Sequence, residues 1–548
     1  MLTFNPKNNS FIFTSNDEER ARAVGLTLST KVRSADGEKI WYTADTDKNP
    51  TFNPYAAMSL WDEADERARE KLTHLKSDYE ASWASEYGGD FPTPNRINPK
   101  TGERFAYLPY QKAGIAYGIN KQNCLIGDEP GLGKTIQAVG INNATESQKN
   151  LVICPASIRL NWQKEIREWS TIPRVSTYPI LKSSDGVNPC VNYTIVSYDL
   201  ARRPGIFEAL HEIEWDSIIL DEAHYLKTLE AKRTRAIFGG GMGLFKTEFL
   251  AERAKKIIAL TGTPLPNRPR ECYTLARALC WESIDWSSYE VFTNRYNPSG
   301  YVSSGALIEK KGRLPELHSR LRCNFMVRRL KKDVLKDLPD KRYEFNYVEP
   351  DGAIKEVLAK EKLIDFNPEQ LINPDFELDG EIATVRREMG EAMVPRVVEH
   401  MKYLLDIVER PKIVMFAHHR SVMGALIDSL QRYGIVCVRG GMSTQRKQES
   451  IDEFVVNEKV RLFLGQLDTM EGADGLQQVT DLCVFAEPAW TPGRNEQCVD
   501  RIHRIGQHFN ALAQFMLAEG SFNEKVLKGV LVKARDIHET LDRKRSEI

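Results

Sequence analysis

A glycine-rich stretch between an apolar run and a helical run has the composition of a phosphate-binding loop. It reads GDEPGLGKT, from Gly127 to Thr135. Glycines let a loop pass close to a phosphate, and backbone N–H groups at a helix N-terminus converge on the anion. We expect Lys134 to neutralise the β- and γ-phosphates of ATP and the Thr135 hydroxyl to hold Mg²⁺. Gly131 and Gly133 would line the same nucleotide site.

The loop departs from the strict GxxxxGK(S/T) pattern at one position. Asp128 stands where the first glycine of that pattern belongs. Taken alone, the loop therefore leaves an ordinary strand–turn–helix open as the alternative.

Two adjacent carboxylates, Asp221 and Glu222, open the sequence DEAH directly after another apolar run. A carboxylate at the carboxyl end of a strand faces the ligand crevice of an open α/β sheet. Asp221 would bind Mg²⁺ through water, and Glu222 would orient and deprotonate the attacking water. The alternative is a helix N-cap, which Asp and Glu also favour. The phosphate-loop sequence upstream argues against that alternative.

Two arginines near the C-terminus, Arg501 and Arg504, are three residues apart. On a helix that spacing places both on one face. We expect both guanidiniums to reach a γ-phosphate held by the first lobe, as arginine fingers. Hydrolysis would then depend on closure of the lobes. A pair of surface salt bridges is the alternative for any isolated RxxR sequence.

Two sets of apolar runs predict the sheets that position these groups. The first set is 124–126, 151–154, 193–196, 217–220 and 256–260, and the second is 413–416, 436–438, 460–464 and 482–485. Short runs without polar alternation are typical of parallel strands buried on both faces. Because amphipathic helical stretches alternate with the runs, we predict two α/β sheets in tandem.

The first 100 residues form a separate, small α+β domain in this interpretation. Strands are expected at 11–13 and 40–43, a polar helix at 56–85, and a linker at 88–101. Trp41 lies near several basic residues, so the domain is either a DNA-binding platform or a structural cap on the first lobe. Core packing is the default for Trp41, Trp61 and Trp83, and base stacking is the minority interpretation.

The composition excludes several classes of protein. The 548 residues carry a net charge of -1, so any DNA-binding surface must come from local clusters. Candidates are the run at 310–313 and the group Arg328, Arg329, Lys331 and Lys332, each of which is otherwise a solvated face. The nine cysteines form no CxxC pair, so we expect no metal beyond Mg²⁺ carried with the nucleotide. No membrane span or secretion signal is expected.

Together the motifs resemble a Swi/Snf-type DNA translocase of helicase superfamily two. The motifs, in order, are LPYQ (108–111), GDEPGLGKT, CPASIRLNW (154–162), DEAH, LTGTP (260–264), MVRRL (326–330) and DRIHRIGQ (500–507). They extend from about 105 to 545. The resemblance implies two RecA-like lobes with parallel sheets, and it implies that Gln111 reads the adenine and Gly475 contacts the nucleotide. It also implies that Thr261 to Thr263 couple the nucleotide site to DNA.

A narrower resemblance is to the annealing-helicase, fork-remodelling branch of this family. It rests on FAHH (416–419), the stretch 326–341, Arg268-Pro269 and WTPG (490–493). The acidic loop 471–476 and the long segment 229–250 depart from the branch, which weakens expectations about substrate geometry. His418 and His419 are expected to end a strand and touch solvent or DNA phosphate.

The resulting hypothesis is an ATP-dependent translocase, monomeric and using Mg²⁺, that remodels or anneals branched duplex DNA in replication, recombination or repair. The expected domains are 1–100, a first lobe at 101–345, a helical connector at 346–385 and a second lobe at 386–548. The alternatives are a strand-separating helicase and a DNA-binding scaffold with weak ATPase. DNA is the expected partner, with replication or repair proteins beside it. The absence of histone-reading modules favours the cytoplasm of a bacterial or virus-infected cell.

Overall fold

The structure is a computed structural model of the chain, and it describes most of the sequence. Described are residues 1–5, 10–17, 21, 27–36, 38–42, 60, 62–97, 102–240, 248–262, 264, 269–284, 287–296, 299–301, 307–309, 314–364, 380–470, 474–490 and 492–527. Contacts between Cα atoms divide the chain into two compact units, with the main boundary between Val334 and Leu335. Within the described ranges, no helix is long and apolar enough to cross a membrane.

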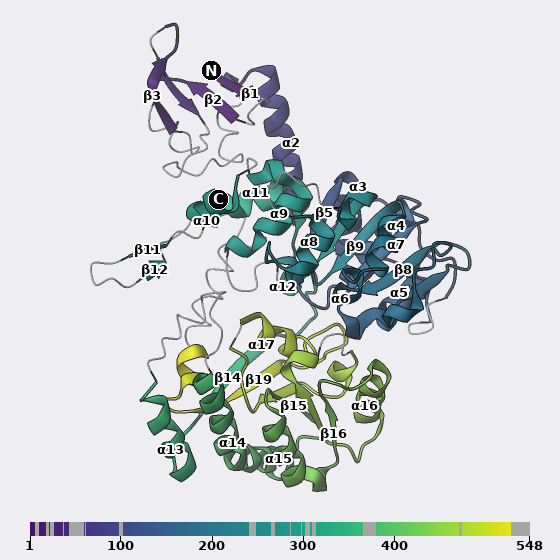
Figure 1. Ribbon diagram of the computed structural model, residues 1–548, viewed down its shortest axis with the longest axis vertical. Helices are drawn as coiled ribbons and strands as arrows, with labels where there is room; N and C mark the ends of the chain where they lie inside the picture. Colours follow the sequence, from purple (N-terminus) through teal and green to yellow (C-terminus); the bar gives the residue numbers. More distant parts are fainter. Residues whose placement is uncertain are drawn as a thin grey trace. The chain divides into compact units, whose positions relative to one another are not determined.

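A four-stranded antiparallel sheet forms the N-terminal part of the first unit (Figure 1). Its strand order is β1 (Leu2–Asn5), β2 (Ser10–Thr14), β4 (Lys39–Tyr42) and β3 (Thr27–Arg33). Phe13 and Trp41 from this sheet pack with Leu72 of helix α2 (Glu66–Trp83). The Trp41 ring is fully buried, so the base-stacking interpretation of this residue is wrong and core packing is confirmed. Trp61 lies outside the described residues.

Seven parallel strands form the sheet of the first lobe. Their order is β13 (Met326–Val327), β5 (Asn123–Ile126), β10 (Ala254–Leu260), β9 (Trp215–Asp221), β6 (Asn150–Cys154), β8 (Tyr193–Ser197) and β7 (Thr177–Pro179). Successive side chains of a strand point to opposite faces. Accordingly, Leu125 and Ile218 belong to one apolar core while Ile126 and Ile219 belong to another.

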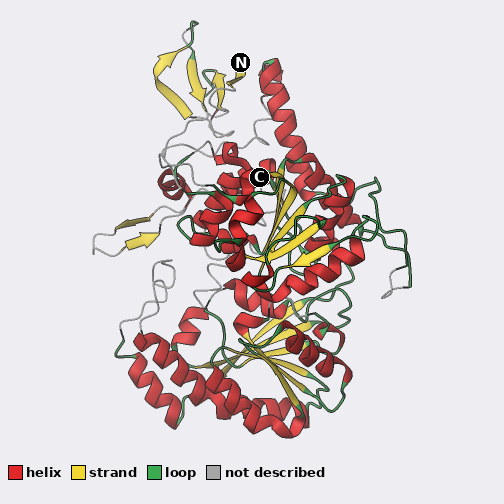
Figure 2. Ribbon diagram, turned by 45° about the vertical axis from the view of Figure 1, so that its right-hand side comes forward, coloured by secondary structure: helices red, strands yellow, loops and turns green. Residues whose placement is uncertain are grey.

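Helices cover both faces of this sheet (Figure 2). One core includes side chains of α3 (Pro109–Asn120), α4 (Lys134–Ala144) and α5 (Arg159–Trp169), and the other includes side chains of α7 (Ile206–His211), α8 (Lys232–Phe238) and α9 (Tyr273–Cys280). The remaining elements of the unit are α6 (Tyr198–Ala201), α10 (Tyr289–Tyr296), β11 (Ser299–Tyr301), β12 (Leu307–Glu309), α11 (Leu314–Asn324) and α12 (Lys331–Val334).

Six parallel strands form the sheet of the second lobe. Their order is β14 (Lys341–Val348), β19 (Ala511–Ala518), β18 (Leu482–Phe485), β15 (Ile413–Ala417), β17 (Leu462–Gln466) and β16 (Ile435–Val438). The helices are α13 (Gly352–Glu361), α14 (Gly380–Lys402), α15 (Arg420–Leu430), α16 (Thr444–Val456) and α17 (Pro492–Val499). Val414 and Met415, adjacent in β15, belong to different cores on the two faces. Two tandem α/β lobes of the RecA type, with a small N-terminal sheet, are therefore confirmed.

The two lobes each contain strands that the apolar runs did not predict. In the second lobe, β14 and β19 pair in parallel over eight residues, from Lys341 opposite Ala511 to Val348 opposite Ala518. From the sequence, residues 341–345 are expected at the end of the first lobe, with a helical connector from residue 346. The pairing with β19 explains why the contact boundary falls at Leu335 instead.

Candidate nucleotide site

The glycine-rich loop lies between β5 and α4, at the carboxyl edge of the first sheet. Gly131 and Gly133 have φ angles of 92° and 71°, in the left-handed region that side chains disfavour. At Gly133 a Cβ atom would also lie 2.5 Å from Nε2 of Gln111. Backbone conformation therefore favours glycine at both positions.

Lys134 is the first residue of α4, and its ammonium group lies over the loop. Its Nζ donates to the carbonyl oxygens of Asp128 at 2.9 Å and Glu129 at 3.4 Å. Burial lowers the pKa of Lys134, while the negative charges of Glu222, Asp128 and Asp221 act to raise it. The structure therefore brings Lys134 into the electrostatic neighbourhood of both predicted acidic residues.

Asp221 ends β9 and is held by three contacts. The indole Nε1 of the buried Trp162 donates to Oδ2 at 2.7 Å, and the backbone N–H of Glu222 donates to Oδ1 at 2.9 Å. The Tyr198 hydroxyl donates to the Asp221 carbonyl at 2.7 Å. Burial, followed by the charge of Glu222, raises the pKa of the Asp221 carboxyl above its usual value. The helix N-cap alternative for Asp221 is wrong, because the residue belongs to the strand itself.

Glu222 has a left-handed backbone conformation, with φ of 50° and ψ of 51°. This conformation costs energy for a residue with a Cβ atom, and strained backbones of this kind cluster at functional sites. The ring Nδ1 of His224 lies 3.2 Å from Oε2 of Glu222 and 3.1 Å from Oγ1 of the buried Thr261. His224 thus joins the DEAH sequence to the TGTP sequence. Thr263 lies outside the described residues, and the coupling role expected of 261–263 stays a prediction.

Gln111, expected to read the adenine, is buried beside the end of the loop. Its Oε1 accepts from the backbone N–H of Leu108 at 3.0 Å, which closes the first turn of α3. A Cβ atom at Gly133 would lie 2.5 Å from its Nε2, so the Gln111 amide lies next to this loop glycine. Its role in adenine recognition stays a prediction.

Asp128 serves as an anchor, which explains why it stands at a glycine position. Its side chain is fully buried and accepts from Arg329 at both oxygens, at 3.0 Å from Nε and 2.6 Å from Nη2. Gln137 of α4 adds a third side-chain bond, at 2.9 Å. The guanidinium binds the carboxylate in a bidentate manner, so two parallel hydrogen bonds fix its orientation in addition to the attraction between the charges.

The basic group around Arg329 is a buried support. Arg328, Arg329 and Lys331 have exposures of 7%, 3% and 2%, whereas Lys332 is exposed. Both sequence interpretations, a DNA-binding surface and a solvated face, are therefore wrong for the first three residues. The other candidate cluster, 310–313, lies outside the described residues. The missed signal is that Arg328 directly follows the strand Met326–Val327, where a solvated face is not expected.

These residues fit a nucleotide with Mg²⁺. Lys134 supplies a cation near the loop, and Asp221 and Thr135 supply the oxygen ligands that Mg²⁺ prefers. Among the described residues, no group of three or more His, Cys, Asp or Glu side chains is arranged to hold a metal ion.

The sequence matches two known domain families. The SNF2-related domain matches residues 42–412, more than half of the chain, and the helicase conserved C-terminal domain matches residues 397–506. The chain belongs to the SNF2-related family. In this SNF2-related chain the match begins at residue 42, well before residue 105, where the sequence motifs placed the start of the resemblance. Helix α2 is therefore part of the matched region.

Curated relatives of this SNF2-related chain are much longer than it is. The SWI/SNF-related matrix-associated actin-dependent regulator of chromatin subfamily A-like protein 1 of Bos taurus is 30% identical over 443 residues, 76% of this chain and 43% of that protein. The DNA annealing helicase and endonuclease ZRANB3 of Homo sapiens is 28% identical over 478 residues, 83% of this chain and 42% of that protein. The chain spans less than half the length of these relatives.

Two solved structures align with this chain at low scores. The Sulfolobus solfataricus SWI2/SNF2 ATPase core in complex with dsDNA has a TM-score of 0.38 and 20% identity, covering 83% of this chain and 100% of that chain. The Pyrococcus furiosus Hef helicase domain has a TM-score of 0.44 and 16% identity, covering 77% and 98%.

The second lobe of this SNF2-related chain carries the predicted arginines, but not on a helix. Helix α17 ends at Val499, and Arg501 and Arg504 lie in the turns that follow it. The one-face argument from helical spacing is therefore wrong. Arg501 is mostly buried, and Arg504 donates from Nη1 to Oδ1 of Asp474 at 3.1 Å. Their roles as arginine fingers stay predictions.

Gly475, next to Asp474, has a φ of 106°, which requires glycine. Its expected contact with the nucleotide stays a prediction. Of the acidic loop around it, residues 471–473 lie outside the described residues.

His418 and His419 follow β15, as predicted, but they are tied to a residue that the sequence analysis missed. Glu487, with an exposure of 3%, accepts from both of their backbone N–H groups, at 2.8 and 2.9 Å. Nδ1 of His419 lies 2.6 Å from Oε1 of Glu487. The His419 side chain keeps an exposed fraction of 19%, so contact of this ring with solvent or DNA phosphate stays a prediction. Glu487 thus holds the two residues that directly precede α15.

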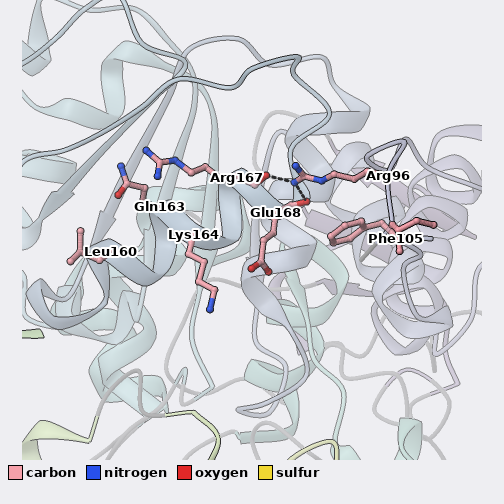
Figure 3. A pocket seen from close by; sticks show the side chains of 8 residues that line it. Arg96, Phe105, Leu160, Gln163, Lys164, Arg167 and Glu168 are labelled. Carbon is pink, nitrogen blue, oxygen red and sulfur yellow. Dashed lines mark hydrogen bonds between the residues drawn. The ribbon is translucent and has the colours of Figure 1, made fainter. Parts of the chain in front are cut away.

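A groove of about 460 Å³ lies on the first lobe, away from these residues (Figure 3). It is lined by Arg96, Ile97, Phe105, Leu160, Gln163, Lys164, Arg167 and Glu168. The Arg96 guanidinium donates to the carbonyls of Arg167 and Glu168 at the carboxyl end of α5. At 3.6 residues per turn, Trp162 lies on the opposite face of α5 from Leu160 and Lys164. The groove contains none of the predicted nucleotide residues.

Proposed function

We propose that this SNF2-related chain is an ATP-driven, DNA-dependent motor that tracks along duplex DNA and remodels or anneals branched structures. The observation that carries the proposal is the gathering of Lys134, Asp221 and Glu222 in one lobe, where the carboxylate charges act on the Lys134 ammonium. A cation from a glycine loop and two acids from a strand end are the parts that phosphoryl transfer needs.

In the proposed reaction, the residues of the first lobe each have a distinct task. Lys134 would offset the charge of the β- and γ-phosphates. Thr135 would hold Mg²⁺ directly and Asp221 would hold it through water, and the ion would supply positive charge beside the phosphates. Glu222 orients the attacking water and accepts its proton. Trp162 keeps the Asp221 carboxylate in place through its 2.7 Å bond.

We assign Arg501 and Arg504 of the second lobe to the transition state, where they would stabilise the γ-phosphate. A step that needs residues of both lobes would couple hydrolysis to movement. Support comes from the SNF2-related and helicase C-terminal matches, which together span both lobes.

The DNA substrate is inferred from the relatives. ZRANB3 of Homo sapiens is named a DNA annealing helicase, and its similarity covers 83% of this chain. This favours annealing and remodelling over strand separation. The gathered Lys134, Asp221 and Glu222 also argue against a scaffold whose ATPase has decayed.

One experiment tests the proposal. ATP hydrolysis by the full chain is measured with single-stranded, duplex, forked and four-way DNA, with Lys134→Ala as the inactive control. We expect the strongest stimulation by duplex or branched DNA and an annealing activity on complementary strands. Equal or greater stimulation by single strands, with net strand separation, would instead establish a strand-separating helicase.

A further inference from the structure

The segment from Phe325 to Arg329 runs beside the first residues of the phosphate loop. The backbone N–H groups of Leu125, Gly127 and Glu129 donate to the carbonyls of Phe325, Val327 and Arg329, at 2.7, 2.8 and 3.1 Å. These bonds extend the pairing of β5 and β13 past the strand and into the loop. The loop entrance is therefore backed by a second stretch of main chain, which we name the support segment (325–329).

Arg328 of the support segment joins two parts of the nucleotide site. Its Nη1 donates to the carbonyl of Gly127 at 2.6 Å and to the carbonyl of Gly262 at 3.1 Å. Gly127 opens the phosphate loop, and Gly262 belongs to the TGTP sequence. One buried guanidinium thus fixes the spacing between these two segments.

Arg322, at the end of α11, joins Arg328 to the N-terminal helix. Its Nη1 donates to the Arg328 carbonyl at 3.0 Å and to the Ser82 carbonyl at 2.9 Å. The guanidinium also lies 3.6 Å from the centre of the Trp83 ring. Ser82 and Trp83 are the last two residues of α2, and Arg322 has an exposure of 1%.

Helix α2 is in turn part of the N-terminal core. Leu72 and Ala68 of α2 pack with Phe13 and Trp41 of the small sheet. The contacts therefore run without a break from the N-terminal sheet through α2 and Arg322 to Arg328 and the phosphate loop.

We propose that Arg322 and Arg328 are positioning residues through which the N-terminal helix α2 sets the geometry of the phosphate loop and so the rate of ATP turnover. The inference rests on the proposed ATPase function and adds a role for the N-terminal segment in it. A planar guanidinium that bonds two carbonyls and stacks on an indole has one favourable arrangement, so displacement of α2 changes the position of Arg328. Chains of packed and hydrogen-bonded side chains of this kind carry coupling between sites.

The first test changes the indole under Arg322. Trp83→Ala removes the stacked ring, whereas Trp83→Phe keeps an aromatic face under the guanidinium. We expect Trp83→Ala to lower kcat at saturating duplex DNA by roughly 3- to 30-fold, the range of such couplings. Trp83→Phe should retain most of the rate. Binding of a fluorescent ATP analogue should still give one site per chain in both variants.

The matched control breaks another contact of α2 with the first lobe. Lys71 bonds Glu282 at 3.1 Å, and both side chains are partly exposed. Lys71→Ala should leave kcat unchanged, because this contact does not lead to Arg322. A loss in Lys71→Ala equal to that in Trp83→Ala would show that any loosening of α2 matters, and it would overturn the proposal.

The second test places Trp83→Ala in an Arg328→Lys background. If coupling passes through Arg328, Trp83→Ala should lower kcat by a smaller factor in the Arg328→Lys background than in the wild-type chain. A double-mutant cycle measures this difference. Fully additive losses would overturn the proposal. A decrease in kcat of Trp83→Ala matched by an equal loss of ATP-binding sites would overturn it as well, because it indicates misfolding alone.

The outcomes also separate this inference from the proposed function. A wild-type chain without DNA-stimulated hydrolysis would refute both. An active wild-type chain with a normal Trp83→Ala variant would refute this inference alone.

Discussion

Asp128 and Arg329, 201 residues apart in sequence, form a buried bidentate ion pair at the entrance of the phosphate loop. Removing one partner of such a pair leaves an uncompensated buried charge. Asp128→Ala should therefore destabilise the first lobe by about 3–5 kcal/mol. Hydrogen exchange of the β5 and α4 amides measures the loss of stability.

The control is Asp90→Ala. Asp90 pairs with Lys112 but is 89% exposed, and this pair should contribute less than about 1 kcal/mol. Equal protection in both variants would contradict the anchoring role.

Glu222→Gln should separate ATP binding from hydrolysis. The amide keeps the size of the side chain but cannot accept the proton of the attacking water, so turnover should fall by about 10²- to 10⁴-fold. Binding of a fluorescent ATP analogue should be retained, whereas Lys134→Ala should lose the countercharge and with it hydrolysis. Near wild-type turnover in both variants would overturn the assignment of the active site.

Trp162→Phe should weaken the hold on Mg²⁺. The substitution removes the indole N–H that bonds Asp221 and keeps an aromatic ring in the core. Residues that orient metal ligands typically contribute 10- to 100-fold to metal affinity, so the Mg²⁺ concentration for half-maximal ATPase should rise by about that factor. Trp169→Phe is the control, because Trp169 lies on the same helix and packs on Phe105 and Tyr107. The same Mg²⁺ requirement in both variants would refute the role of Trp162.

Arg501→Ala should reduce DNA-stimulated turnover by roughly 10³-fold or more, if this residue acts as an arginine finger. Because Arg501 is mostly buried, the rate must be expressed per folded chain, as judged by thermal unfolding. Arg494→Ala removes a more exposed arginine from the same region and serves as the control. A decrease in rate that only follows the loss of folded protein would show that Arg501 is structural.

Glu361 predicts how the stability of the second lobe varies with pH. Its Oε2 accepts from the backbone N–H of Phe522 at 2.8 Å, and burial raises the pKa of Glu361 from 4.5 to about 7. The folded chain therefore binds this proton more tightly than the unfolded chain. The stabilising effect is complete below the unfolded pKa and is lost as the pH rises through the folded pKa.

Glu361→Gln keeps an acceptor for Phe522 and cannot ionise. At about pH 8 it should raise the free energy of unfolding by about 1–3 kcal/mol, and the gain should shrink toward about pH 5. Thermal unfolding across this range measures the difference, with the exposed Glu356→Gln on the same helix as the control. A gain that does not change with pH would contradict the raised pKa.

The nucleotide residues were predictable because their signals are local. An apolar run directly precedes both the loop between β5 and α4 and the acidic residues at the end of β9. Runs of this kind also predicted the central strands of both sheets. β14 was missed because polar residues interrupt the apolar ones in KRYEFNYV, so the segment contains no continuous apolar run, and because it lies at the sheet edge, where its residues are partly or fully exposed. The structural role of Arg329, and Glu487 altogether, were missed for another reason. The role of each residue depends on a partner that is distant in sequence, and residue types alone do not predict such pairs.

The distance in sequence between the phosphate loop and the support segment also orders the events of synthesis. Gly127 and Arg328, which are bonded in the finished lobe, are 201 residues apart. At 5–20 residues per second, the ribosome needs roughly 10–40 s to make the intervening chain. During that interval the nascent chain contains the whole glycine-rich sequence but lacks the support segment that contacts it. The contacts that Arg328 and Arg329 make with the loop thus form late, and a chain terminated before β13 has a nucleotide loop without them.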